Sequence, residues 1–119
     1  MTEEDRRAAE RHNVYIGAEI DVGEGPVRSA ITRDASARGL LLLTRAKLEV
    51  GQRVKINVFL SEGESRSIHA RVVRQEPLNA EENALWRLKA AVEIEPPDLE
   101  LADRLVELAA QQAKTYGSG

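Results

Sequence analysis

The sequence contains no cysteine and few aromatic residues, and each shortage argues against a class of protein. Without cysteine, the 119-residue chain has neither a disulfide framework nor a thiolate metal site. Aromatic residues make up 3% of the chain, too few for the stacking platforms on which single-stranded nucleic acids usually bind. The formal net charge is −3, which also disfavours a nucleic-acid partner. A small barrel that binds single-stranded nucleic acid stays a weaker alternative, which filter binding with a steep salt dependence would support.

Long apolar segments are also missing. The longest purely apolar run covers residues 40–43, whereas a membrane-spanning helix needs about 20 such residues. Residues 1–13 are polar and charged, without the apolar core of a signal peptide. We therefore expect a soluble cytoplasmic protein that does not insert into a membrane. The length favours a single domain.

Five short segments alternate between apolar and polar residues, which is typical of strands that bury one face, and a sixth, over residues 40–44, contains a continuous leucine run that suggests a strand buried on both faces. These segments cover residues 14–22, 27–33, 40–44, 54–60, 67–72 and 86–94. Glycine and proline signal turns between them, most clearly over residues 23–26. Six antiparallel strands predict a small closed or nearly closed barrel, because closure removes exposed strand edges.

A helix is predicted after the last strand. Leu101, Leu105 and Leu108 recur at helical spacing, and Asp98 lies where the positive end of the helix dipole favours a carboxylate. The fold class is therefore mainly β, a six-stranded antiparallel barrel with a C-terminal α-helix. We expect a flexible arm over residues 1–13, the barrel over 14–95, the helix over 96–113 and a tail over 114–119.

Two further stretches combine residue types that suit ligand binding. Arg7 and Arg11 are four positions apart in the N-terminal arm, and Asp34, Ser36 and Gly39 lie in a turn before the leucine run. Taken separately, the arginines are better explained as a solvated basic patch and the Asp–Ser pair as turn residues. Together with the strand pattern, they favour a binding site.

The two stretches resemble the signature of the PilZ domain, RxxxR followed by [D/N]xSxxG. The matching residues are Arg7-Ala8-Ala9-Glu10-Arg11 and Asp34-Ala35-Ser36-Ala37-Arg38-Gly39. The resemblance covers most of the chain and implies a receptor for cyclic di-GMP, a bacterial second messenger. It assigns Arg7 and Arg11 to guanine and phosphate, Asp34 and Ser36 to the donor edge of one guanine, and Gly39 to close approach of a base.

The chemistry of these residue types fits that ligand. Guanine exposes O6 and N7 as adjacent acceptors, which the fork of an arginine matches with two parallel hydrogen bonds. The same fork matches a phosphate and can stack on a purine. The opposite edge of guanine, N1–H and N2–H₂, carries donors and needs acceptors such as a carboxylate or a hydroxyl.

Two more arginines belong to the candidate site. Arg6 precedes the RxxxR motif, and in the family that it resembles an arginine there implies a stacked pair of ligands, so we expect an intercalated dimer of cyclic di-GMP. Arg38 replaces a glycine that many members carry. If that position requires a positive φ, Arg38 is strained by about 1 kcal/mol; otherwise its side chain can reach the ligand.

The sequence does not predict an enzyme. It has no nucleophilic cysteine, glycine-rich phosphate loop or defensible catalytic triad, and His12 and His69 are isolated from any metal-like cluster. We expect no cofactor besides the ligand. The implied function is an adaptor in which cyclic di-GMP orders the arm over the barrel and changes binding to a downstream effector protein. The alternative is a PilZ-like adaptor for proteins that binds no nucleotide, and the intact signature argues against it.

Overall fold

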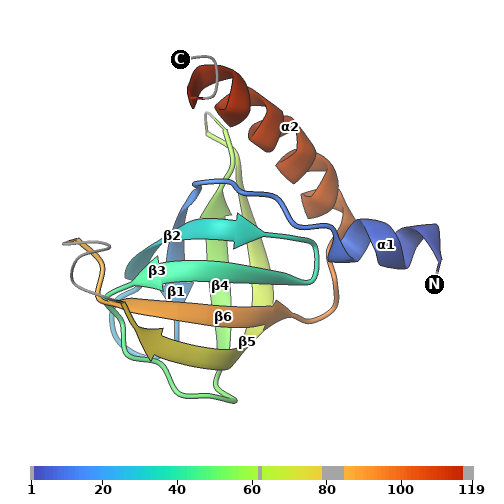
Figure 1. Ribbon diagram of the computed structural model, residues 1–119. Helices are drawn as coiled ribbons and strands as arrows, with labels where there is room; N and C mark the ends of the chain where they lie inside the picture. The colour runs from blue at the N-terminus through green and yellow to red at the C-terminus, as the bar shows by residue number, and fades with distance from the viewer. Residues whose placement is uncertain (1, 62, 79–84, 117–119) are drawn as a thin grey trace.

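The six predicted strands form a closed antiparallel barrel (Figure 1). The computed structural model describes residues 2–61, 63–78 and 85–116. The strands are β1 (Gly17–Asp21), β2 (Arg28–Ala35), β3 (Gly39–Thr44), β4 (Arg53–Phe59), β5 (Ser65–Pro77) and β6 (Leu88–Ile94), and the helices are α1 (Glu3–Ala9) and α2 (Leu99–Tyr116). Around the barrel the order is β1, β2, β3, β6, β5, β4. The predicted fold class is confirmed.

Alternating side chains from the strands fill the barrel. Ile20, Leu42 and Ile56 are fully buried, as the period of two along each strand requires. Leu101 and Leu105 of α2 belong to the same apolar core, so the helix closes one end of the barrel (Figure 1). The apolar stripe of the predicted helix therefore packs on the ends of the strands.

Several element boundaries differ from those predicted. The C-terminal helix begins at Leu99 rather than residue 96 and continues to Tyr116, into the predicted tail. It begins there because the N–H of Leu101 donates to Oδ1 of Asp98 at 3.1 Å, which makes Asp98 the helix cap. The last strand begins at Leu88 rather than residue 86. Between the fifth and sixth predicted strands, residues 79–84 lie outside the described residues.

The first three strands also start or end differently from the prediction. Residues 14–16 run beside β2 and precede β1, with the N–H of Ile16 donating to Oγ1 of Thr32 at 2.9 Å. The turn predicted over residues 34–39 is shorter, because Asp34 and Ala35 belong to β2. These shifts move the aspartate of the signature from a turn into a strand.

Gly39 is needed where β3 approaches β6. A Cβ built on Gly39 would lie 2.7 Å from the carbonyl oxygen of Val92, far inside van der Waals contact. The close approach predicted for a base is thus made, in this structure, by the backbone of β6. Arg38 does not have a positive φ, so the strain considered for it is absent.

Asp98 connects the start of α2 to the barrel. Arg66 of β5 donates to it twice, from Nε and from a terminal nitrogen, the latter at 2.8 Å from Oδ1. Burial alone would raise the pKa of Asp98, but the hydrogen bonds from Arg66 and from backbone N–H groups outweigh it and hold the pKa below its ordinary value. The ionised form is therefore stabilised in the fold.

We predict that Gly39→Ala lowers the free energy of unfolding by about 1–3 kcal/mol, because β3 and β6 must separate to admit the methyl group. Urea denaturation measures the change. Gly17→Ala is the matched control, since its Cβ would meet no closer atom than Cδ2 of Phe59 at 3.8 Å. Equal stability of the two variants would contradict the prediction.

We also predict that Asp98→Asn costs about 1–2 kcal/mol at neutral pH, because the charge-assisted bonds from Arg66 are lost while the amide can still cap the helix. Since the folded pKa of Asp98 is depressed, its contribution is complete above the unfolded value near 3.8 and is lost as pH falls through the lower folded value. The stability gap between wild type and variant should therefore be constant down to about pH 5 and shrink below pH 4. A gap that widens in acid would refute this account.

Candidate functional site

The N-terminal segment is a short docked helix. α1 begins with a capping box in which the side chains of Thr2 and Asp5 bond each other's backbone N–H. Hydrogen bonds from the side chain and backbone of Thr2 lower the pKa of Asp5. Ala8 is buried against Ala37 and Ala102, which fixes α1 between α2 and the turn after β2. The flexibility expected of the arm over residues 1–13 stays a prediction.

The chain after α1 is fastened along β2. The N–H of His12 donates to the carbonyl of Ala35 at 2.8 Å, and the N–H of Ala35 donates to the carbonyl of His12 at 3.0 Å. Further along, the hydroxyl of Thr32 donates to the carbonyl of Val14 at 2.7 Å. This pairing brings Arg11 beside Asp34, so the two halves of the signature meet.

Only one of the two carboxylate oxygens of Asp34 has a hydrogen-bond partner among the described residues. Its Oδ2 accepts from Arg11 at 3.3 Å. Its Oδ1 is buried and has no hydrogen-bond partner among the described residues. A buried, unpaired carboxylate oxygen costs free energy, so such a group usually signals strain or an absent partner.

Ser36 shapes the turn that follows. Its Oγ accepts from the N–H of Arg38 and from the N–H of Gly39, both at 3.1 Å. The side chain is buried, so in this structure it bonds its own turn. The tight turn directs Arg38 outward, where a terminal nitrogen lies 3.4 Å from Oδ1 of Asp5 in α1.

A cavity of about 390 Å³ lies over the outer surface of four neighbouring strands, β2, β3, β6 and β5. Four of the seven predicted site residues line it, namely Arg11, Asp34, Arg38 and Gly39. The other lining residues are Leu40, Leu41, Val73, Arg74, Ala91, Val92 and Glu93. The volume lies within the range typical of small-molecule sites.

Arg6 and Arg7 point elsewhere. Arg6 pairs with Glu3 within α1, and its side chain is exposed. Arg7 pairs with Asp103 of α2. Neither residue lines the cavity, so the structure brings only part of the arginine cluster to the site.

The sequence prediction missed Val73, Arg74 and Glu93, which form the far side of the cavity. The sequence indicates an irregularity beside Val73 and Arg74, because Val72 and Val73 interrupt the alternation of β5, but it does not show which way the following side chains turn. The structure has a β-bulge at this point, where the register shifts between Val72 and Arg74.

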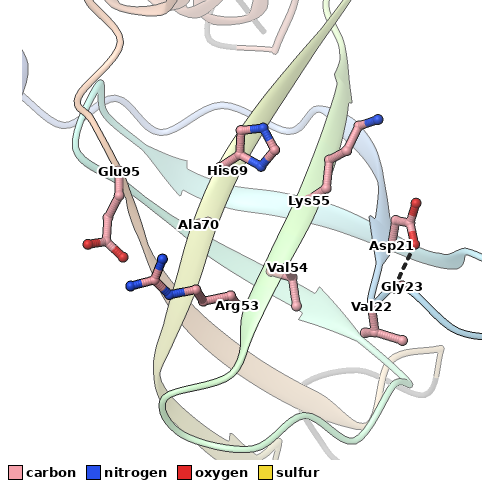
Figure 2. Close-up of a pocket in the computed structure, with 9 residues that line it drawn as sticks. All are labelled: Asp21, Val22, Gly23, Arg53, Val54, Lys55, His69, Ala70 and Glu95. Atoms are coloured by element: carbon pink, nitrogen blue, oxygen red, sulfur yellow. Dashed lines mark hydrogen bonds between the residues drawn. The ribbon is translucent and has the colours of Figure 1, made fainter.

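A second, larger cavity of about 540 Å³ lies over β4 and β5. Figure 2 shows Arg53, Lys55 and His69 projecting from these strands, with Asp21 and Glu95 at its borders. Its lining mixes cationic and anionic side chains and includes no residue of the signature. The smaller cavity is therefore the better candidate site.

Two further observations concern metal binding and membrane-spanning helices in the described part of the chain. No group of three or more histidine or acidic residues is arranged there to hold a metal ion. Its helices are also too short or too polar to cross a membrane.

Comparison with solved structures gives the same fold at low sequence identity. The PilZ domain of YcgR from Escherichia coli, solved with c-di-GMP, has a TM-score of 0.75 and 11% identity over 92% of this chain and 96% of that domain. MotI/DgrA, the inhibitor of motility of Bacillus subtilis, has a TM-score of 0.63 and 15% identity over 89% of this chain. The PilZ domain of CeSA from a cellulose-synthesizing bacterium has a TM-score of 0.57 and 20% identity, covering 87% of this chain and 98% of that domain.

These matches differ in how much of each protein they cover. The chain spans 50% of the length of MotI/DgrA, whereas it matches nearly all of the two isolated domains. No curated protein matches by sequence. The family model of the PilZ domain matches residues 5–111, which include both halves of the signature, all six strands and most of α2. The chain belongs to the PilZ domain family.

Proposed function

We propose that this chain is a cyclic di-GMP receptor that acts as an adaptor, with the nucleotide bound in the 390 Å³ cavity. The observation that carries the proposal is Asp34, which lines the cavity beside Arg11 and whose Oδ1 is buried without a hydrogen-bond partner among the described residues. Membership of the PilZ family and the likeness to a YcgR domain solved with c-di-GMP support the choice of ligand.

The cavity supplies both the hydrogen-bond acceptors and the hydrogen-bond donors that guanine requires. The unpaired oxygen of Asp34 can accept from N1–H and N2–H₂, which are donors on one edge of the base. Arg11 and Arg38 supply forks for O6 and N7 or for phosphate oxygens. Leu41 and Ala91 offer an apolar floor for a flat base. A ligand without such donors would leave Oδ1 of Asp34 unpaired.

We assign the remaining signature residues more indirect roles. Ser36 keeps the turn in the shape that exposes Arg38, and Gly39 lets β6 come close enough to complete the floor. Arg7 contacts the ligand only after α1 has moved. Arg6, also on α1, would join a second nucleotide, so we propose an intercalated dimer of cyclic di-GMP.

Binding would rearrange α1. In this structure Arg7 is paired with Asp103, and Asp5 of α1 is paired with Arg38. Phosphates entering the cavity would compete with these carboxylates for the guanidinium groups. Exposed ion pairs contribute only about 0–1 kcal/mol each, so a ligand bound with micromolar affinity, about −8 kcal/mol, exceeds them. The helix would then leave α2 and cover the ligand.

The expected output is a changed surface and not a chemical reaction. Repositioned α1 would uncover Ala102 on α2 and alter the local charge, which a downstream effector protein can recognise. We propose no enzymatic activity and no cofactor besides the nucleotide. Because the proposed ligand is an intracellular messenger, the cytoplasm is the proposed compartment.

We predict that calorimetric titration detects cyclic di-GMP binding near two nucleotides per chain and no binding of GTP or cyclic AMP. Asp34→Ala and Arg11→Ala should each weaken the affinity by about 10-fold or more while the melting temperature changes little, because the aspartate is only partly satisfied and the arginine is exposed. Arg53→Ala, an exposed arginine of the other cavity, is the control. A stoichiometry near one would refute the paired ligand, and absence of binding would favour the protein-binding adaptor.

We predict that Asp103→Asn tightens cyclic di-GMP binding by about 2- to 5-fold, because it removes the carboxylate that competes for Arg7. Arg7→Ala should weaken binding and should cancel the gain in the double variant. Glu107→Gln on the same helix is the control, since Glu107 pairs with Arg104. Equal affinity of Asp103→Asn and wild type would indicate that the Arg7–Asp103 pair does not oppose binding.

A further inference from the structure

Two strands of the barrel depart from regular pairing beside the candidate site. Among the strand pairs formed by the described residues, register shifts occur between Thr32 and Asp34 in β2 and between Val72 and Arg74 in β5. Since β3 and β6 are the two strands between β2 and β5, both bulges border the same strip of outer surface. Figure 1 shows these four strands side by side.

Each bulge reverses the direction of a charged side chain. By strict alternation Asp34 would share the inner face with Ala30 and Thr32, which are buried. Arg74 would likewise follow Ala70 and Val72 into the core. The extra residue in each strand restores both charges to the outer face.

Asp34 and Arg74 then lie at opposite sides of the strip of outer surface formed by β3 and β6. In the register, Asp34 is opposite Leu41, Leu41 is opposite Ala91, and Ala91 is opposite Arg74. All four residues line the cavity. Three strand spacings separate the outer backbones by roughly 14 Å, a width that a flat base and a long arginine side chain can fill together.

Arg74 is loosely held, as a ligand-binding arginine needs to be. Its side chain is 64% exposed, and Nε lies 3.7 Å from a carboxylate oxygen of Glu76, which also pairs with Lys89 at 3.4 Å. Arg71 on the same strand is by contrast held by Glu93 and Glu95, each at 3.2 Å. With Arg11 and Arg38, Arg74 is the third arginine that lines the cavity, and arginine forks suit an anionic nucleotide.

We propose that Arg74 is a further ligand-binding residue, whose guanidinium fork takes O6 and N7 of the guanine that Asp34 holds by its donor edge. This inference rests on the proposed function, because it assigns one more contact to the same ligand. The base lies on Leu41 and Ala91, with the aspartate at one edge and the arginine at the other. The pair selects guanine over adenine, which has an amino donor where guanine has O6.

Titration of wild type, Arg74→Ala and Arg74→Lys with cyclic di-GMP and cyclic di-AMP tests the assignment. Arg74→Ala should weaken cyclic di-GMP binding by about 10-fold and reduce the preference over cyclic di-AMP by a similar factor. Arg74→Lys should recover little of either, because an ammonium group does not match two adjacent acceptors. Arg53→Ala is again the matched control.

The possible failures are distinguishable. If wild type binds cyclic di-GMP and Arg74→Ala binds it equally well, the role of Arg74 is refuted and the proposed function stands. If Arg74→Lys binds like wild type, the residue acts as a point charge and the assigned fork is wrong. If wild type does not bind at all, the proposed function and this inference both fail. Unchanged thermal unfolding of the variants shows that the fold is intact, as the exposure of Arg74 leads us to expect.

Discussion

Two backbone hydrogen bonds between His12 and Ala35 determine where the N-terminal segment runs, and the site depends on that course. They lie at 2.8 and 3.0 Å and use no side chain, so they can fix the path of the chain with any residue at position 12 except proline, which lacks the N–H. Residues far apart in the sequence are thereby brought together, because Arg11 follows α1 and Asp34 lies near the end of β2. The outer surface of the barrel forms most of the cavity lining, and the pairing between His12 and Ala35 holds Arg11 beside it.

The arginines around the site are balanced by carboxylates. Arg7, Arg11 and Arg38 each lie within an ion pair, with Asp103, Asp34 and Asp5 respectively. This balance explains how a chain with a net charge of −3 can carry a cluster of arginines without strong self-repulsion. Exposed pairs of this kind are weak, so they can orient the guanidinium groups and still exchange partners with a phosphate.

The sequence was sufficient to predict the barrel because its strands obey a strict period, and Ile20, Leu42 and Ile56 are buried as that period requires. It failed where the period breaks. Whether a strand contains a bulge depends on how it pairs with its neighbouring strands. The outward direction of Asp34 and Arg74 could therefore not be derived from spacing alone. The docking of Arg7 on Asp103 could not be predicted either, because it depends on how α1 meets α2.

The buried side chains between α1 and the rest of the protein are three alanines, with the partly buried Leu99 packed against them. Ala8, Ala37 and Ala102 are buried there, and each methyl group contributes only about 0.8 kcal/mol when it is removed from water. Contacts this slight are compatible with the movement proposed for the helix. Leucine in place of Ala8 would need more room than the neighbouring alanines leave, and a remodelled interface that accommodated it would hold the helix in one position. The smallness of these three side chains thus suits the movement proposed for the N-terminal helix.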